Sequence, residues 1–524
     1  MKFSLKLSLV ALMLAAGACT DLDVQPTDRV TPEVLFKDES AYRAFIARVY
    51  AGLAVTGQDG PAGNADISSL DEGFSNYLRQ YWQLQELTTD EAIIGWGDEG
   101  LPDLHNHTWS PANQFVRAMY YRIFFQVSMA NEFLRETTDD KLNARSVSAS
   151  VRNDIKLYRA EARFLRALSY WHGMDLIGNI PFYTEESPFG SEAPKQSTRD
   201  AVFRFIEGEL AAIENDMPAP GTADYGRADR AALWMLQAKL YLNAKTYIGS
   251  EKNTECIAAC KKVIGTQLYT LQDNWRDLFK TDNNNSKEII WAIPFDGLST
   301  QTWGGMTYLV HAPVGGSMKP GDYGINGGWF GLRATKSLVN LFPDPSGAID
   351  ERANFYTNGQ TLEINSIGNF GDGYAVQKFT NVSSDGTGGA DLDHPDTDYP
   401  MFRLADAYLM YAEAVVRGGT GGDRATALGY INALRDRAYN GPAGRINDAA
   451  MTDAFILDER SRELYWEGSR RTDLIRYNKF TDNGIWPWKG GIAAGRTTES
   501  FRNLFPIPTS ELLANKNLTQ ILGY

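Results

Sequence analysis

Amphipathic helical segments recur along this chain and limit the folds that it can adopt. Residues 154–171 carry apolar side chains at a spacing of three or four, which places them on one face of a helix. Residues 229–244 repeat the pattern, and residues 402–417 show it a third time. Burying such faces requires helices that pack against one another, so we expect a mainly α-helical protein.

Two of the helical segments are joined by a short glycine-rich turn. The segment 402–417 ends at Gly418 and Gly419, and a second helical segment begins at Arg424. Paired helices with small alanine positions and short turns are typical of tetratricopeptide-type helix–turn–helix units. The sequence therefore predicts a tetratricopeptide-like scaffold.

The chain changes character between about residues 283 and 400. Glycine, asparagine, aspartate and serine become frequent there, helical periods become rare, and short β-like runs such as residues 288–295 occur. Loops on a rigid scaffold often carry binding residues. We expect this segment to be a loop-rich, partly β ligand-binding insert within one unit that covers residues 19–524.

Three tryptophans fall in glycine-flanked sequence instead of in the periodic segments. They are Trp96 in IGWGD, Trp303 in TWGG and Trp329 in GGWFG. Each one alone has two interpretations, a core indole beside a tight turn or an exposed ring on a loop. Flat exposed aromatic rings stack on the C–H faces of sugars. Three such tryptophans in one chain favour a carbohydrate-binding surface.

The charge balance argues against one class of partner. The chain has 51 basic and 65 acidic residues, a net charge of −14, and no run rich in lysine and arginine offsets it. Nucleic-acid binding needs a concentrated positive surface. We therefore expect no nucleic acid among the partners.

The N-terminal residues have the features of a secretory signal. Lys2 and Lys6 precede an apolar run, residues 7–16, that is too short to span a bilayer comfortably. Small residues and then Cys19 follow, which resembles a bacterial lipoprotein signal. We expect residues 1–18 to be the signal peptide and Cys19 to be lipidated, with plain secretion as the alternative. No later stretch reaches about 18 uninterrupted apolar residues, so lipid is the expected membrane attachment.

Two further cysteines lie four residues apart in a helical pattern. Cys256 and Cys260 therefore point to one face of the helix. A zinc site would need more ligands nearby than the sequence offers. We expect two small buried thiols, with a disulfide as the alternative.

The best candidates for a catalytic acid/base pair are three glutamates in ERSRELYWEG. Glu459, Glu463 and Glu467 are spaced by four and interleaved with arginines. Helical salt-bridge scaffolding explains this spacing better than glycoside hydrolysis does. The five histidines show no metalloprotease or triad spacing, and no GxSxG or phosphate-binding loop is present. We therefore expect no enzymatic activity.

Fragments along the whole chain resemble the SusD/RagB family. They include AEARFLRALSYWHGMDLIGNIPF at residues 160–182, FRLADAYLMYAEAVVR at 402–417, ERSRELYWEGSRRTDLIRYNKF at 459–480 and LFPIPTSELLANKNLTQILGY at 504–524. Members of this family are lipid-anchored glycan-binding proteins that sit over a TonB-dependent transporter of the outer membrane. The resemblance implies a surface-exposed outer-membrane lipoprotein with such a transporter as partner.

Other fragments are similar to the starch-binding members of the family. They include ELTTDEA at residues 86–92, GRADRAALWMLQAKLYLNA at 226–244 and WKGG at 488–491. The resemblance implies that starch or malto-oligosaccharides bind on an aromatic arc made by Trp96, Trp303 and Trp329. Trp303 stands where those members have tyrosine, so it keeps a ring and loses a hydroxyl. A different glycan is the alternative ligand.

The resemblance also implies polar contacts beside the arc. Arg79, in NYLRQ, matches an arginine that hydrogen-bonds sugar hydroxyls, and Asp71, in the DEG motif, is a further candidate. Glu99 stands where the family pattern has asparagine, which adds charge near the groove. Glu99 is therefore a candidate contact that, unlike asparagine, has no NH2 group with which to donate a hydrogen bond to the ligand.

Two loops rich in oxygen ligands suit a hard cation. They are LFKTDNNN at residues 278–285 and DHPDTD at residues 393–398. The resemblance implies a structural calcium near these loops, with Asp282, Asn284, Asp396 and Asp398 as candidate ligands. Acidic turns without a metal are the alternative, because the EF-hand spacing is absent. No catalytic cofactor is expected.

Overall fold

The computed structural model describes residues 32–524, apart from residues 59, 62–64, 69 and 188–191. The predicted signal peptide, residues 1–18, and the predicted lipidated residue, Cys19, lie outside the described residues. In the part that is described, no helix is long and apolar enough to cross a membrane.

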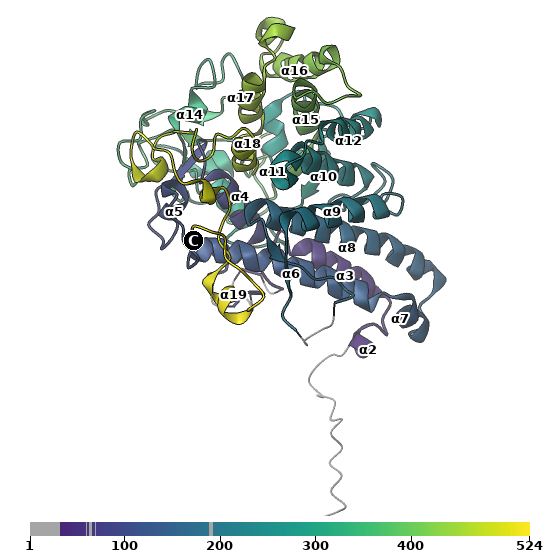
Figure 1. Cartoon of the computed structure of the whole chain (residues 1–524). Helices are drawn as coiled ribbons and strands as arrows, with labels where there is room; N and C mark the ends of the chain where they lie inside the picture. Colours follow the sequence, from purple (N-terminus) through teal and green to yellow (C-terminus); the bar gives the residue numbers. More distant parts are fainter. Residues whose placement is uncertain (1–31, 59, 62–64, 69, 188–191) are drawn as a thin grey trace, which may run out of the picture.

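Helices dominate the structure and stack side by side (Figure 1). Their bounds are α2 Pro32–Leu35, α3 Ser40–Ala51, α4 Tyr77–Glu86, α5 Pro102–Asn106, α6 Gln114–Glu136, α7 Asp139–Ala144, α8 Ala149–Leu176, α9 Arg199–Ile213, α10 Arg230–Leu242, α11 Ala244–Ile248, α12 Asn253–Gly265, α13 Gly305–His311, α14 Lys336–Val339, α15 Leu404–Val416, α16 Arg424–Ala438, α17 Asp453–Leu464, α18 Arg470–Arg476 and α19 Thr509–Ala514. Helix α6 packs against α8, α8 against α9, α10 against α12, and α12 against α15, which in turn contacts α16 and α17. The predicted mainly α-helical scaffold is confirmed.

The helix boundaries follow local capping chemistry. Helix α10 begins after Asp229, whose carboxylate accepts hydrogen bonds from two backbone N–H groups of the first turn at 2.8 and 3.1 Å. Asn113 does the same for α6, at 3.0 and 3.2 Å. Helix α8 is longer at both ends than the predicted 154–171, and it is followed by Gly178 in the left-handed region.

The strands are short and form antiparallel pairs. Their bounds are β1 Ala92–Ile94, β2 Ile180–Pro181, β3 Gln196–Ser197, β4 Ile289–Ile293, β5 Leu332–Ala334, β6 Phe355–Tyr356, β7 Ala375–Val376 and β8 Tyr399–Arg403. The pairs are β1 with β5, β2 with β3, β4 with β8, and β6 with β7. Strand β4 lies within the predicted β-like run 288–295, and the irregular segment that follows it carries only short elements up to β8 in the described structure.

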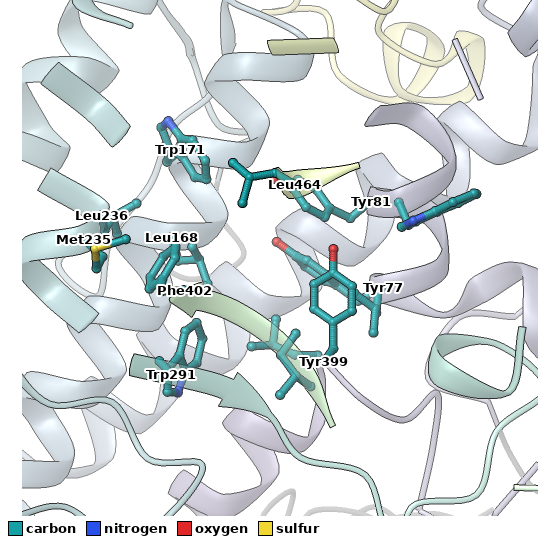
Figure 2. Close-up of a cluster of buried hydrophobic side chains, with 14 of the residues drawn as sticks. Tyr77, Tyr81, Leu168, Trp171, Met235, Leu236, Trp291, Tyr399, Phe402 and Leu464 are labelled. Carbon is teal, nitrogen blue, oxygen red and sulfur yellow. The ribbon is translucent and has the colours of Figure 1, made fainter. Parts of the chain in front are cut away.

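The apolar core joins the helical stack to these strands. Figure 2 shows buried side chains that come from helices and strands far apart in the sequence. The labelled ones are Tyr77 and Tyr81 of α4, Leu168 and Trp171 of α8, Met235 and Leu236 of α10, Leu464 of α17, and Trp291, Tyr399 and Phe402 of the β4–β8 pair. Helix α4 is buried along its whole length. It therefore provides a fixed base for the loops beside it.

Helix α12 contains the two predicted thiols. Cys256 and Cys260 are both buried and free. Burial raises the pKa of the Cys256 thiol, with the neighbouring Cys260 adding to the effect. The prediction of two buried thiols is confirmed, and the disulfide alternative is not seen.

Candidate functional site

The pairing of β1 with β5 brings two tryptophan loops together. Backbone Gly95 N–H donates to the carbonyl of Gly331 at 3.0 Å, which extends the ladder beyond the strands. The indole Nε1 of Trp96 then donates to the carbonyl of Trp329 at 3.0 Å. Gly331 lies against the Trp96 ring so closely that an added Cβ would stand 2.5 Å from Cε2. Glycine is required there because any side chain would displace the indole.

Three indoles form a row with Trp329 in the middle. The ring centroids of Trp96 and Trp329 are 6.2 Å apart, and those of Trp303 and Trp329 are 6.5 Å apart. Successive ring planes differ by 48° and 47°, so the row presents tilted faces. Trp303 is 40% exposed, and the other two rings are partly buried against the core. The structure brings together the three tryptophans that the sequence singled out. Their role in ligand binding stays a prediction.

Two histidines support this row from the protein side. The imidazole of His311 stacks on Trp329 with centroids 4.9 Å apart and planes 25° apart. His394 contacts Trp303 at the same centroid distance. His311 is buried, and burial lowers its pKa, although hydrogen bonds to two backbone carbonyls act in the opposite direction. Its two ring nitrogens lie 2.7 Å from the carbonyl of Gly327 and 3.0 Å from that of Asp393, which holds the imidazole in place against Trp329.

The Trp303 loop is anchored to residues just before α4. The Glu72 carboxylate accepts hydrogen bonds from the backbone N–H of Trp303 at 2.8 Å and from the Thr302 hydroxyl at 2.7 Å. Asn76, the N-cap of α4, accepts from the backbone N–H groups of Arg79 and Gly305, each at 3.0 Å. One residue thus caps the helix and holds the loop. These bonds fix the backbone that carries the most exposed indole.

Arg79 lies beneath the arc and is only 4% exposed. Its guanidinium carbon is 4.4 Å from the ring centroid of Tyr308, 4.7 Å from that of Phe74 and 5.9 Å from that of Trp96. Nη1 donates to the backbone carbonyl of Trp303 at 3.4 Å. Burial lowers the pKa of Arg79, partly offset by nearby Tyr308 and acidic groups. These contacts make Arg79 a support for the aromatic rings. Its predicted hydrogen bond to sugar stays a prediction.

The two acidic candidates beside the arc are both exposed. The Asp71 carboxylate accepts from the backbone N–H of Phe74 at 3.3 Å, and Asp71 directly precedes Glu72. Glu99 follows Trp96 by three residues, and its backbone carbonyl accepts from the Gln114 side chain at 2.7 Å. Both side chains are therefore accessible on loops of the site. Their contact with a ligand stays a prediction.

The two predicted calcium segments lie side by side. The Asn283 side chain donates to the carbonyl of Asp398 at 2.9 Å and accepts from its N–H at 3.3 Å. The candidate carboxylates already have protein donors. Asp398 accepts from Phe295 N–H at 2.7 Å and from the Tyr225 hydroxyl at 2.5 Å, and Asp396 accepts from Gly297 N–H at 2.8 Å.

The other two candidate ligands are further out on the same segments. Asp282 accepts from the backbone N–H of Ser384 at 2.9 Å, and the Asn284 side-chain oxygen accepts from Asn285 at 3.2 Å. Across the described residues, no group of three or more histidines, cysteines and acidic residues is placed to hold a metal ion. The juxtaposition of the segments fits the calcium prediction, while the donor set is incomplete. Calcium stays a prediction.

The three glutamates considered as catalytic candidates belong to a buried ionic network. Arg352 lies 2.9 Å from Glu459 and 3.1 Å from Glu463, and Arg403 lies 2.7 Å from Glu463 and from Glu467. Burial opposes ionisation of Glu459, but Arg352 and two other arginines outweigh it and lower its pKa to about 2. A general acid needs a raised pKa and access to substrate. Glu459 and Glu463 have neither, because both are buried and arginines lower the pKa of each.

One detail of the scaffolding prediction is wrong. Helix α17 ends at Leu464, and Trp466 has a positive φ of 63°, so Glu467 lies outside the helix. Most of the pairing arginines come from other elements, whereas Arg462 pairs with Glu459 within the helix at 2.7 Å. The network therefore ties separate segments together, which sequence spacing alone could not reveal.

A separate cavity of about 360 Å³ lies beside α3 and β4, away from the arc. Its lining is mainly apolar and includes Tyr50, Tyr158, Tyr225 and Trp291. None of the arc tryptophans lines it. The arc and this cavity are therefore separate features of the described structure.

Comparison with known proteins gives consistent matches. A model of the SusD family matches residues 343–524. The starch-binding protein SusD of Bacteroides thetaiotaomicron is 34% identical over an alignment that covers 100% of this chain and 98% of that protein.

Solved structures show the same fold. A SusD superfamily protein from Bacteroides thetaiotaomicron has a TM-score of 0.71 at 18% identity and covers 92% of this chain and 99% of its own. Surface glycan-binding protein A from the same organism, in complex with laminarihexaose, has a TM-score of 0.70 at 18% identity, with coverages of 92% and 98%.

Proposed function

The chain belongs to the SusD family, and we propose that it binds starch and malto-oligosaccharides on the arc of Trp96, Trp329 and Trp303. The observation that carries the proposal is the row of three tilted indoles, in which histidines pack against Trp329 and Trp303. The name of the relative that is 34% identical supports the choice of ligand.

The physical basis is stacking of glucose rings on rigid indoles. An α-1,4-glucan curves, so successive sugar faces change direction along the chain as the indole planes do. Each stacked ring contributes on the order of 1 kcal/mol beyond its buried area, so several rings are needed for useful affinity. Because the indoles are held by backbone hydrogen bonds, little protein ordering is required on binding. The surface should therefore prefer long oligosaccharides to monosaccharides.

The cellular setting is part of the same proposal. We infer that Cys19 carries a lipid anchor, that the protein faces the cell exterior at the outer membrane, and that it passes bound glucan to a TonB-dependent transporter. Support comes from the N-terminal sequence and from family membership. The protein acts as a binder and not as a hydrolase, in keeping with the paired state of Glu459 and Glu463.

A different glycan is the competing ligand, because a structural neighbour is in complex with laminarihexaose. Affinity electrophoresis separates the two. Retarded migration in gels containing amylopectin, and free migration in gels containing laminarin, is the expected result. Retardation by laminarin alone would overturn the starch assignment while leaving glycan binding intact. Leu513→Ala, which removes an exposed apolar side chain on α19, is the control and should migrate like the wild type.

A further inference from the structure

Phe330, directly after the central tryptophan of the arc, is an exposed aromatic ring with an unusual backbone. Its side chain is 53% exposed, and its φ of 55° lies in the left-handed region that glycine adopts most readily. A phenylalanine in this conformation carries strain that the surrounding structure must sustain. Neither the burial of the ring nor a local backbone preference accounts for phenylalanine at this position.

The backbone at Phe330 is held by a ladder to the chain that follows α13. The N–H of Trp329 donates to the carbonyl of His311 at 2.9 Å, and that of Phe330 donates to Val314 at 3.0 Å. The N–H of Gly331 donates to Ala312 at 2.8 Å. These bonds tie the backbone of the loop to the end of α13 and to the residues that follow it.

The Phe330 ring packs against Phe370 and Gly315. Phe330 meets Phe370 edge to face, with centroids 5.5 Å apart. Gly315 lies against both rings, since an added Cβ would stand 2.7 Å from Phe330 and 2.8 Å from Phe370. A glycine beneath two rings allows them to approach the backbone closely. The Phe330 ring thus packs against the protein on one side and is exposed to solvent on the other.

Three successive residues of this loop carry or contact aromatic rings. Trp329 provides the central indole, Phe330 provides an exposed ring, and Gly331 packs against the ring of Trp96. We propose that Phe330 is a further stacking position that extends the arc and contacts a glucose unit of the bound chain beyond those held by the three indoles. This inference rests on the proposed function and adds a determinant of chain-length preference.

The consequence concerns oligosaccharide length. A short chain occupies the three indoles, whereas a longer chain also reaches Phe330. Removal of one stacking ring should then weaken binding of the longer chain by about three- to tenfold. Binding of the shorter chain should change little. A phenylalanine that served only the fold would show no dependence on chain length.

The test compares Phe330→Gly and Phe330→Tyr with the wild type by isothermal titration with maltotriose and maltoheptaose. Phe330→Gly relieves the backbone strain, so its melting midpoint should equal or exceed that of the wild type. It should lose affinity for maltoheptaose selectively. Phe330→Tyr keeps a ring and should retain the affinity of the wild type.

Other outcomes overturn the inference in distinguishable ways. Unchanged binding of both sugars by Phe330→Gly, while Trp96→Ala binds weakly, would remove Phe330 from the site and leave the proposed function standing. Equal weakening for both sugars would place the ring within the arc and not beyond it. A lower melting midpoint with unchanged binding would assign the ring to the fold. Absence of binding by the wild type would contradict the proposed function itself.

Discussion

Glu72 and Trp303 are joined by a hydrogen bond of 2.8 Å from the backbone N–H of Trp303 to the Glu72 carboxylate, although 231 positions separate them. The other carboxylate oxygen accepts from the hydroxyls of Thr302 and Thr56. A single side chain thus connects the segment that precedes α4 to the loop with the most exposed indole of the arc. Glu72 is a positioning residue for ligand binding.

Glu72→Gln should weaken glucan binding without unfolding the protein. The amide keeps the shape of the carboxylate, but only one oxygen remains to accept hydrogen bonds, because the other is replaced by an NH2 group that donates. The Trp303 loop therefore loses part of its anchor. We expect affinity for maltoheptaose to fall by about three- to tenfold, an effect of roughly 1 kcal/mol. Glu251→Gln, at an exposed position between α11 and α12, is the matched control. If both variants bind like the wild type, the loop does not depend on Glu72.

Glu459→Gln should destabilise the protein strongly. Its carboxylate lies within 3 Å of Arg352, Arg435 and Arg462 in a buried setting. Leaving buried arginines without a counter-charge costs about 3–5 kcal/mol. Chemical denaturation should report that loss.

The wild type should release no reducing sugar from maltoheptaose. Hydrolysis by the wild type that disappears in a stably folded Glu459→Gln protein would establish an enzyme instead.

Glu86 and Glu91 form a buried carboxylate pair whose protonation should make stability depend on pH. Burial, and then the charge of Glu91, raise the pKa of Glu86 well above its usual range, and burial raises the pKa of Glu91 to about 7. Backbone N–H groups of Gly468 and Ser469 bind Glu86 at 2.7 and 3.1 Å, and Arg470 lies 3.5 Å from Glu91. Above the ordinary pKa of glutamate, the folded state holds a proton that the unfolded chain has lost. The contribution of the pair to the free energy of unfolding therefore declines as pH rises through the raised pKa values.

Glu86→Gln isolates this effect because glutamine does not titrate. We expect the unfolding free energy of the variant, relative to the wild type, to increase as pH rises from about 6 to about 9, by at most about 1.4 kcal/mol per pH unit. Denaturant titrations at several pH values give the difference. A relative stability that is constant or falls over that range would show that the pair carries no shared proton.

The calcium prediction has its own test. The segments around Asn283 and Asp398 touch, so an ion bridging them would stabilise the folded state by mass action. Added calcium should then raise the melting midpoint of protein pretreated with EDTA, and Asp396→Asn should abolish the rise. No response to calcium would leave these carboxylates as acceptors for backbone N–H groups and for the Tyr225 hydroxyl.

Much of the scaffold could be predicted from local pattern. Periodicity located α8, α10, α15 and α16, because the spacing of apolar residues along a helix is a local pattern. The pairing of β1 with β5 could not be foreseen. Each strand has three residues, and the partners lie about 240 positions apart in the chain, so neither carries enough pattern to specify the other.

In the candidate site, too, local features could be predicted from the sequence and contacts between distant residues could not. Glycine-flanked tryptophans were visible in the sequence because loop composition is local. Glu72, His311 and His394 were missed, since each acts through a contact made only in the folded chain. Glu72 was within reach as a member of the same DEG motif as Asp71. Nothing in the sequence distinguishes His311 from an ordinary core histidine.

The most direct test of the central claim is calorimetric titration of the wild type, Trp96→Ala, Trp303→Ala and Trp329→Ala with maltoheptaose. If the three indoles form one glucan-binding surface, the wild type binds and each alanine variant loses about tenfold or more in affinity, with Trp329→Ala the weakest because it removes the middle ring. Leu513→Ala, at an exposed apolar position on α19, should bind like the wild type. Normal binding by all three tryptophan variants would contradict the account.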